Sequence, residues 1–114
     1  SDLKRCSVAQ IEKARIDYQY RTATERCKLL NIPEKWRLRL EHEYEDLQQT
    51  LELWTEHKQA WRELKEKQLH ETLAHWDSLQ IRDTYKEVQF KLKVQKKRWQ
   101  FMLGNIGDFS AAPN

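Results

Sequence analysis

Glycine and proline are scarce in this chain of 114 residues, which contains only two of each. Both glycines and Pro113 lie among the last eleven residues, and Pro33 is the one early proline. β-Sandwiches, Rossmann units and phosphate-binding loops depend on glycine and proline at their turns. The scarcity therefore argues against these architectures and favours an all-α fold.

Long apolar runs and paired cysteines are also missing. No segment approaches the length of a membrane span, and no signal peptide is recognisable, so we expect no membrane-spanning segment. Cys6 and Cys27 are 21 residues apart within one expected helix, about 30 Å at the usual helical rise, and cannot bridge each other there. A reducing compartment is the simpler expectation, and we expect an intracellular chain, with the cytoplasm favoured over the nucleus.

The segment His70-Glu71-Thr72-Leu73-Ala74-His75-Trp76 is close to the zinc-protease pattern His-Glu-x-x-His. Its histidines are five residues apart instead of four, which turns the second ring by roughly 140° around a helix. His42 and His57 stand alone among charged residues and supply no third ligand. With no glycine-rich loop or convergent set of acids either, we expect no catalytic activity, metal, cofactor or small-molecule substrate.

Apolar spacing predicts a first helix over about residues 2–30. One stripe of this helix is expected to face the core and consists of Val8, Ile11, Ala14, Tyr18 and Leu29. A second stripe, Ile16, Tyr20 and Cys27, lies on the opposite side. The helix should stop near Asn31-Ile32-Pro33, because proline disfavours the helical conformation of the residue before it.

A second helix is predicted over residues 33–76, with Pro33 and Glu34 in its first turn. Its apolar face keeps one direction for 41 residues, which predicts a single helix roughly 60 Å long. This face comprises Trp36, Leu40, Leu47, Leu51, Trp54, Trp61, Leu69 and Trp76.

A third helix is predicted over residues 79–104, ending at Gly104. Its seam alternates spacings of four and three and consists of Ile81, Tyr85, Val88, Leu92, Gln95, Trp99, Met102 and Ile106. Residues 88–94 also alternate apolar and polar side chains as a strand would, but a lone strand would have no sheet to join.

The junction at Asp77-Ser78-Leu79-Gln80 reads as a helix start with Asp77 as the cap. We therefore predict an all-α fold, an elongated antiparallel three-helix arrangement with a long central helix. Residues 1–107 would form one coiled-coil-like module and residues 108–114 a flexible tail. The alternative is two helices, one continuous over 33–104, in a coiled-coil dimer. Net charges of +3, −4 and +4 over residues 1–31, 32–80 and 81–114 favour the antiparallel arrangement.

Five apolar residues are candidates for binding a partner: Trp36, Trp76, Phe90, Val94 and Phe101. Large aromatic residues at helical spacing usually fill a core. However, a first helix of about 43 Å and a third of about 39 Å cannot both cover a 60 Å middle helix, which would leave Trp36 and Trp76 partly bare. The other three lie opposite the seam of the third helix, and a helix that is apolar on two sides is usually buried on two sides.

A basic patch follows in the same helix, formed by Lys91, Lys93, Lys96, Lys97 and Arg98. It could contact nucleic acid or a calmodulin-type protein, or it could pair with the acidic middle helix. The overall charge of only +3 makes nucleic acid the weaker interpretation. The sequence thus predicts a non-enzymatic protein-interaction and oligomerisation module that homodimerises and belongs to a larger scaffold or adaptor.

Overall fold

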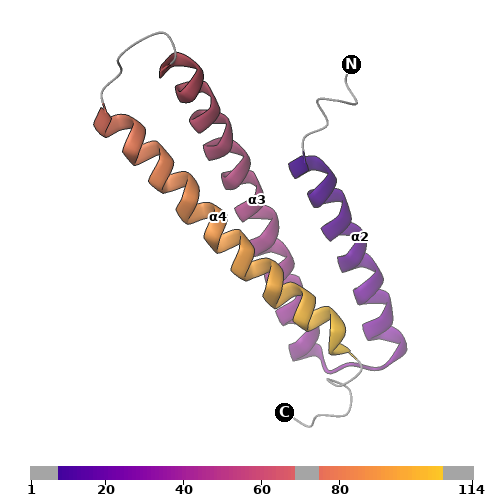
Figure 1. Cartoon of the computed structure of the whole chain (residues 1–114). Coiled ribbons are helices and arrows are strands. Elements are labelled where there is room, and N and C mark those ends of the chain that lie inside the picture. Colours follow the sequence, from indigo (N-terminus) through magenta and orange to yellow (C-terminus); the bar gives the residue numbers. More distant parts are fainter. Residues whose placement is uncertain (1–7, 69–74, 107–114) are drawn as a thin grey trace, which may run out of the picture.

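The computed structural model describes residues 8–68 and 75–106, and every regular element within these ranges is a helix. Helix α2 spans Val8–Leu29, α3 spans Glu34–Gln68 and α4 spans His75–Gly104. The helices run antiparallel in an elongated arrangement, with α4 packed along α3 and the shorter α2 against the first part of α3 (Figure 1). The predicted all-α three-helix fold is confirmed.

The corner between α2 and α3 forms where the sequence predicts it. Asn31 adopts a left-handed conformation with φ of 52°, which asparagine tolerates better than most residues. The Ile32 amide donates to the Cys27 carbonyl at 3.0 Å and the Asn31 amide to the Lys28 carbonyl at 3.4 Å, which is the pattern of a Schellman cap. Because Ile32 is buried, this cap also anchors the corner to the core.

The fully buried core occupies one end of the molecule. Two contacts show that α2 and α3 are antiparallel: the Tyr44 hydroxyl donates to Asp17 Oδ1 at 2.7 Å, and Lys13, earlier in α2, lies 2.9 Å from Glu52, later in α3. We call residues 8–55 and 92–106 the three-helix end, and residues 56–68 and 75–91 the two-helix end. The main buried cluster lies entirely within the three-helix end: Ile16, Ala23, Cys27, Ile32, Leu40, Leu47, Leu51, Leu92, Trp99, Met102 and Ile106. Among the described residues of the two-helix end, only Ser78 is buried.

The middle helix is shorter than predicted. Helix α3 ends at Gln68, and Trp76 belongs to α4 together with residues 77–80, where we had placed a turn. The third helix therefore begins earlier than predicted, at His75 instead of residue 79. Asp77 lies in its first turn, and the Ser78 hydroxyl donates to the His75 carbonyl at 2.8 Å. Leu69, His70 and the other residues up to 74 lie outside the described ranges, as do residues 1–7 and 107–114.

The alternative of one helix over residues 33–104 is wrong. Helices α3 and α4 are separate and pack against each other in opposite directions. Arg98 and Glu43, 55 residues apart, form an ion pair of 3.1 Å between them. The seam predicted for α4 is confirmed: its last five members are buried, and Ile81, Tyr85 and Val88 are half-buried.

The inward face of α2 is the reverse of the one predicted. Val8, Ile11, Tyr18 and Leu29 are exposed, whereas in the second stripe Ile16 and Cys27 are buried and Tyr20 is half-buried. Three polar or aromatic residues of α2 also face the other helices and contact them. Asp17 accepts from Tyr44, Gln19 Oε1 accepts from Trp99 Nε1 at 3.0 Å, and the Tyr20 ring stacks on that of Tyr44 with centroids 4.1 Å apart.

Candidate interaction surface

Four of the predicted partner-binding residues lie on α4. Phe90, Val94 and Phe101 are 69%, 38% and 68% exposed, and Trp76 is 79% exposed. Trp76 and Phe90 are 14 residues apart, so at 100° per residue they point within about 40° of each other. We call these four residues the outer face of α4. Trp76 thus joins the stripe predicted for the third helix and is not part of the middle helix.

Trp36, the fifth predicted residue, is half-buried against the core. It lies in a groove between the start of α3 and the end of α4, where it comes together with Phe101 from 65 residues away in the sequence. The guanidinium of Arg39 lies 5.1 Å from the centre of the Trp36 ring. The residues that line this groove are Trp36, Arg39, His42, Glu43, Arg98, Phe101 and Met102.

The predicted basic patch divides into residues with an ion pair and residues without one. Lys96 lies 3.2 Å from Glu12 of α2, and Arg98 bonds to Glu43 of α3, so both help to hold the three-helix end together. The other three, Lys91, Lys93 and Lys97, are exposed and form no ion pair with a described residue. They flank the outer face of α4 and give it a positive border.

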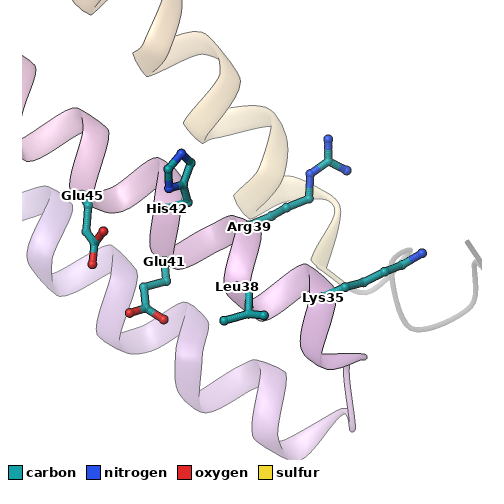
Figure 2. A pocket seen from close by; sticks show the side chains of 6 residues that line it. All are labelled: Lys35, Leu38, Arg39, Glu41, His42 and Glu45. Carbon is teal, nitrogen blue, oxygen red and sulfur yellow. The ribbon is translucent and has the colours of Figure 1, made fainter.

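The exposed side of the first part of α3 carries charges of both signs. Figure 2 shows a surface depression whose six lining residues all come from α3: Lys35, Leu38, Arg39, Glu41, His42 and Glu45. Leu38 is 56% exposed, and the side chains of Glu41 and Glu45 point to the same side of the helix as Leu38 (Figure 2). Two carboxylates and two cationic side chains therefore surround one exposed apolar side chain on this part of α3.

Lysines cover two tryptophans of α3, Trp54 next to the two-helix end and Trp61 within it. Lys58 Nζ lies 4.5 Å from the centre of the Trp54 ring, and Lys65 Nζ lies 5.4 Å from that of Trp61. Both pairs have i, i+4 spacing, which brings side chains together on one helix face. Lysine stems can cover apolar surface while the ammonium group stays in water. These contacts supply part of the cover that a third helix gives elsewhere.

Sequence reasoning missed one apolar surface. The exposed face of α2, with Val8, Ile11 and Tyr18, had been assigned to the core. Both stripes of α2 are apolar, so periodicity alone could not choose between them. The polar residues Asp17 and Gln19, which need partners when they are brought close to other helices, are the signal that would have favoured the observed rotation.

Titratable groups of the core are held in their neutral forms. The hydrogen bond to Asp17 raises the pKa of the Tyr44 hydroxyl, and burial raises the pKa of the Cys27 thiol. Over residues 8–68 and 75–106, no three His, Cys, Asp or Glu side chains are grouped to hold a metal ion. None of the helices described is long and apolar enough to cross a membrane.

No known protein family matches this chain, and no curated protein or solved structure matches it.

Proposed function

We propose that the chain is a non-enzymatic protein-interaction and oligomerisation module within a larger intracellular scaffold. The observation that carries the proposal is the outer face of α4, where Phe90 and Phe101 expose more than two thirds of their surface. The opposite side of the same helix is buried through Leu92 and Trp99. A helix with apolar residues on both sides gains stability when a second surface covers the exposed side.

An intracellular location is part of this proposal. Cys27 is a free cysteine whose thiol is buried in the core. A free thiol in a small helical domain fits a reducing compartment better than an oxidising one. The cytoplasm is therefore our favoured location.

The first test replaces Phe90 and Phe101 together by glutamate. We expect the association of the chain to be lost, because each covered phenylalanine contributes roughly 1.5–3 kcal/mol by removal from water. Sedimentation should show the loss of mass, while circular dichroism should show helix content close to that of the unmodified chain. The control replaces Leu92 and Trp99 by alanine, which should unfold α4. If both pairs of substitutions reduce helicity equally, the outer face belongs to the internal core and the proposal is wrong.

Nucleic-acid binding is the second candidate, and the exposed Lys91, Lys93 and Lys97 are the observation that favours it. Phosphate contacts by several lysines would make the affinity for a short DNA duplex fall steeply with salt, by orders of magnitude for six or more contacts. Association through apolar surfaces would respond much less. A duplex titration at two salt concentrations separates these functions. A calcium-dependent mobility shift tests the calmodulin-type interpretation in the same way.

A further inference from the structure

The groove between the start of α3 and the end of α4 combines apolar and cationic side chains. We call it the Trp36 groove, and its volume of about 510 Å³ lies within the range of sites that bind ligands. Trp36, Phe101 and Met102 supply its apolar surface, and Arg39 and Arg98 supply positive charge. All of its lining residues belong to α3 and α4, so the groove lies outside the contacts that α2 makes with α3.

Two cations lie next to the Trp36 ring. Lys35 Nζ is 5.4 Å and Arg39 Cζ is 5.1 Å from the centre of this ring. Both side chains are exposed, and neither forms an ion pair with a described residue. The ring contacts use no oxygen acceptor, so the N–H donors of both cations are available to a carboxylate.

The end of α4 adds two further cations. Arg98 Nη1 donates to Glu43 Oε1 at 3.1 Å, which fixes the guanidinium across the two helices in the wall of the groove. Lys97 is exposed and forms no ion pair with a described residue. It lies four residues before Phe101, and this spacing places both on the same side of α4. Positive charge therefore borders the groove on both helices.

Acidic residues nearby leave much of this charge unpaired. Glu43 already forms an ion pair, and Asp46 lies 3.7 Å from the His42 ring. The side chains of Glu41 and Glu45 point to the side of α3 opposite His42 (Figure 2). The cations around the groove that no described carboxylate pairs with are Lys35, Arg39 and Lys97.

We propose that the Trp36 groove binds an acidic peptide segment of a partner protein. One aromatic or leucine side chain of the peptide inserts between Trp36 and Phe101, and neighbouring carboxylates bind Lys35 and Arg39. Removal from water stabilises the inserted side chain, and charge-assisted hydrogen bonds fix the carboxylates. The inference rests on the proposed protein-interaction function and identifies the chemistry of the partner, but it does not depend on oligomerisation.

The size and the charges of the groove favour a peptide over a nucleic acid. Its lining residues on α3 run from Trp36 to Glu43, about 10 Å along the helix, which matches one or two side chains of a ligand. A DNA duplex binds through several phosphates in a row, and the Glu43 carboxylate in the wall would repel them.

The experiment measures fluorescence anisotropy of a labelled peptide in which one phenylalanine is flanked by glutamates and aspartates. The whole chain should bind this peptide, and Lys35→Gln with Arg39→Gln should weaken the affinity at least about tenfold through lost charge-assisted hydrogen bonds. Phe101→Ala should weaken it about tenfold through lost apolar cover. All three residues are exposed, so circular dichroism should show unchanged helix content.

A matched control removes two positive charges outside the groove, Arg26→Gln with Arg37→Gln. Both arginines are exposed and lie near Cys27, on the side of α3 that faces α2. This variant should bind the peptide as the unmodified chain does. Equal losses in the two double variants would reduce the binding to general attraction between opposite charges and overturn the inference. Equal affinity for a peptide with alanine in place of phenylalanine would also overturn it.

Other occupants of the groove give different results. Displacement of the peptide by a short DNA duplex at physiological salt would assign the groove to nucleic acid. Loss of dimer mass in the Lys35→Gln, Arg39→Gln variant would assign it to a second copy of the chain. Binding that requires replacement of Asp108 and Phe109 by alanine would assign it to residues 107–114 of the same chain. Each of these outcomes overturns the inference.

The proposed function fails or stands separately. If the peptide does not bind, but replacement of Phe90 and Phe101 by glutamate still abolishes association, the inference is overturned and the interaction module remains. If the peptide binds with the expected losses while the unmodified chain sediments as a monomer, the inference is supported and the oligomerisation is wrong.

Discussion

The two ends of this helical molecule are stabilised in different ways. At the three-helix end, α2 closes one side of the α3 and α4 pair, and the enclosed residues include Leu47 and Trp99, both at most 1% exposed. At the two-helix end, α2 is absent, Trp61 of α3 is half-buried, and the ammonium group of Lys65 lies over its ring. The same α3 helix is thus a core element in one half and a partly solvated element in the other. The difference shows that a third covering helix, and not the apolar pattern of α3, decides where a core forms.

The largest expected effect on the unfolding free energy comes from replacing a buried tryptophan of the three-helix end. Replacing Trp99 by alanine removes a buried ring that packs near Tyr44 and donates to Gln19, and should cost about 3–5 kcal/mol of unfolding free energy. The matched replacement of the half-buried Trp61 should cost about 1–2 kcal/mol, since less of its surface leaves water on folding. Denaturant titrations at one protein concentration measure both. Equal costs would contradict the division into two ends.

A smaller effect is expected from the polar contacts that orient α2. Replacing Tyr44 by phenylalanine removes the hydroxyl that donates to Asp17 and should cost about 1–2 kcal/mol at neutral pH. The pKa of this hydroxyl is raised on folding, so its contribution is complete below the pKa of about 10 of an unfolded tyrosine and is lost as the pH rises through the folded value. Unfolding titrations between pH 8 and 11, values chosen around that pKa, should therefore show a steeper loss of stability for the unmodified chain than for the variant. Parallel curves would rule out this hydrogen bond as a source of stability.

The smallest expected effect concerns the lysines of the two-helix end. Replacing Lys58 by alanine should cost about 0.5–1 kcal/mol, because the ammonium group and its stem no longer cover Trp54. Replacing Lys58 by methionine keeps much of the apolar cover and should lose only the part due to charge. Lys67, which is exposed on the same helix, provides a control whose replacement should change the unfolding free energy by less than about 0.5 kcal/mol. Identical results for Lys58 and Lys67 would show that the contact with Trp54 does not stabilise the helix.

The sequence was sufficient for the fold class and for most of α4. The scarcity of turn residues argued against sheets, Asn31 and Pro33 located the first corner, and the seam through Leu92 and Trp99 had one consistent spacing. The sequence was not sufficient to predict where α3 ends. The apolar residues from Trp36 to Trp76 all fall on one side of a continuous helix. No glycine or proline marks the boundary between the second and third helices. Helical periodicity can persist across a reversal because each helix needs its own apolar face.

The rotation of α2 could not be read from periodicity for a different reason. Two apolar stripes competed, and the buried one is made mainly of small side chains, such as Ala23 and Cys27, which bury little apolar surface each but allow close helix packing. The exposure of Phe90 and Phe101 opposite the seam was predicted correctly, and their role in binding a partner stays a prediction. The pairing of Trp36 with Phe101 in one groove depends on how α3 and α4 fold back, which no local pattern encodes.

Hydrogen exchange measured segment by segment tests the difference between the two ends most directly. Amides of residues 40–51 and 92–103, which belong to the enclosed core, should exchange only when the molecule unfolds globally. Amides of residues 56–67 and 77–88 should exchange at least about tenfold faster, equivalent to roughly 1.4 kcal/mol, through local opening of the two-helix end. We therefore expect a step in amide exchange rate between the two ends along both α3 and α4. Uniform protection along the full length of the two helices would contradict it.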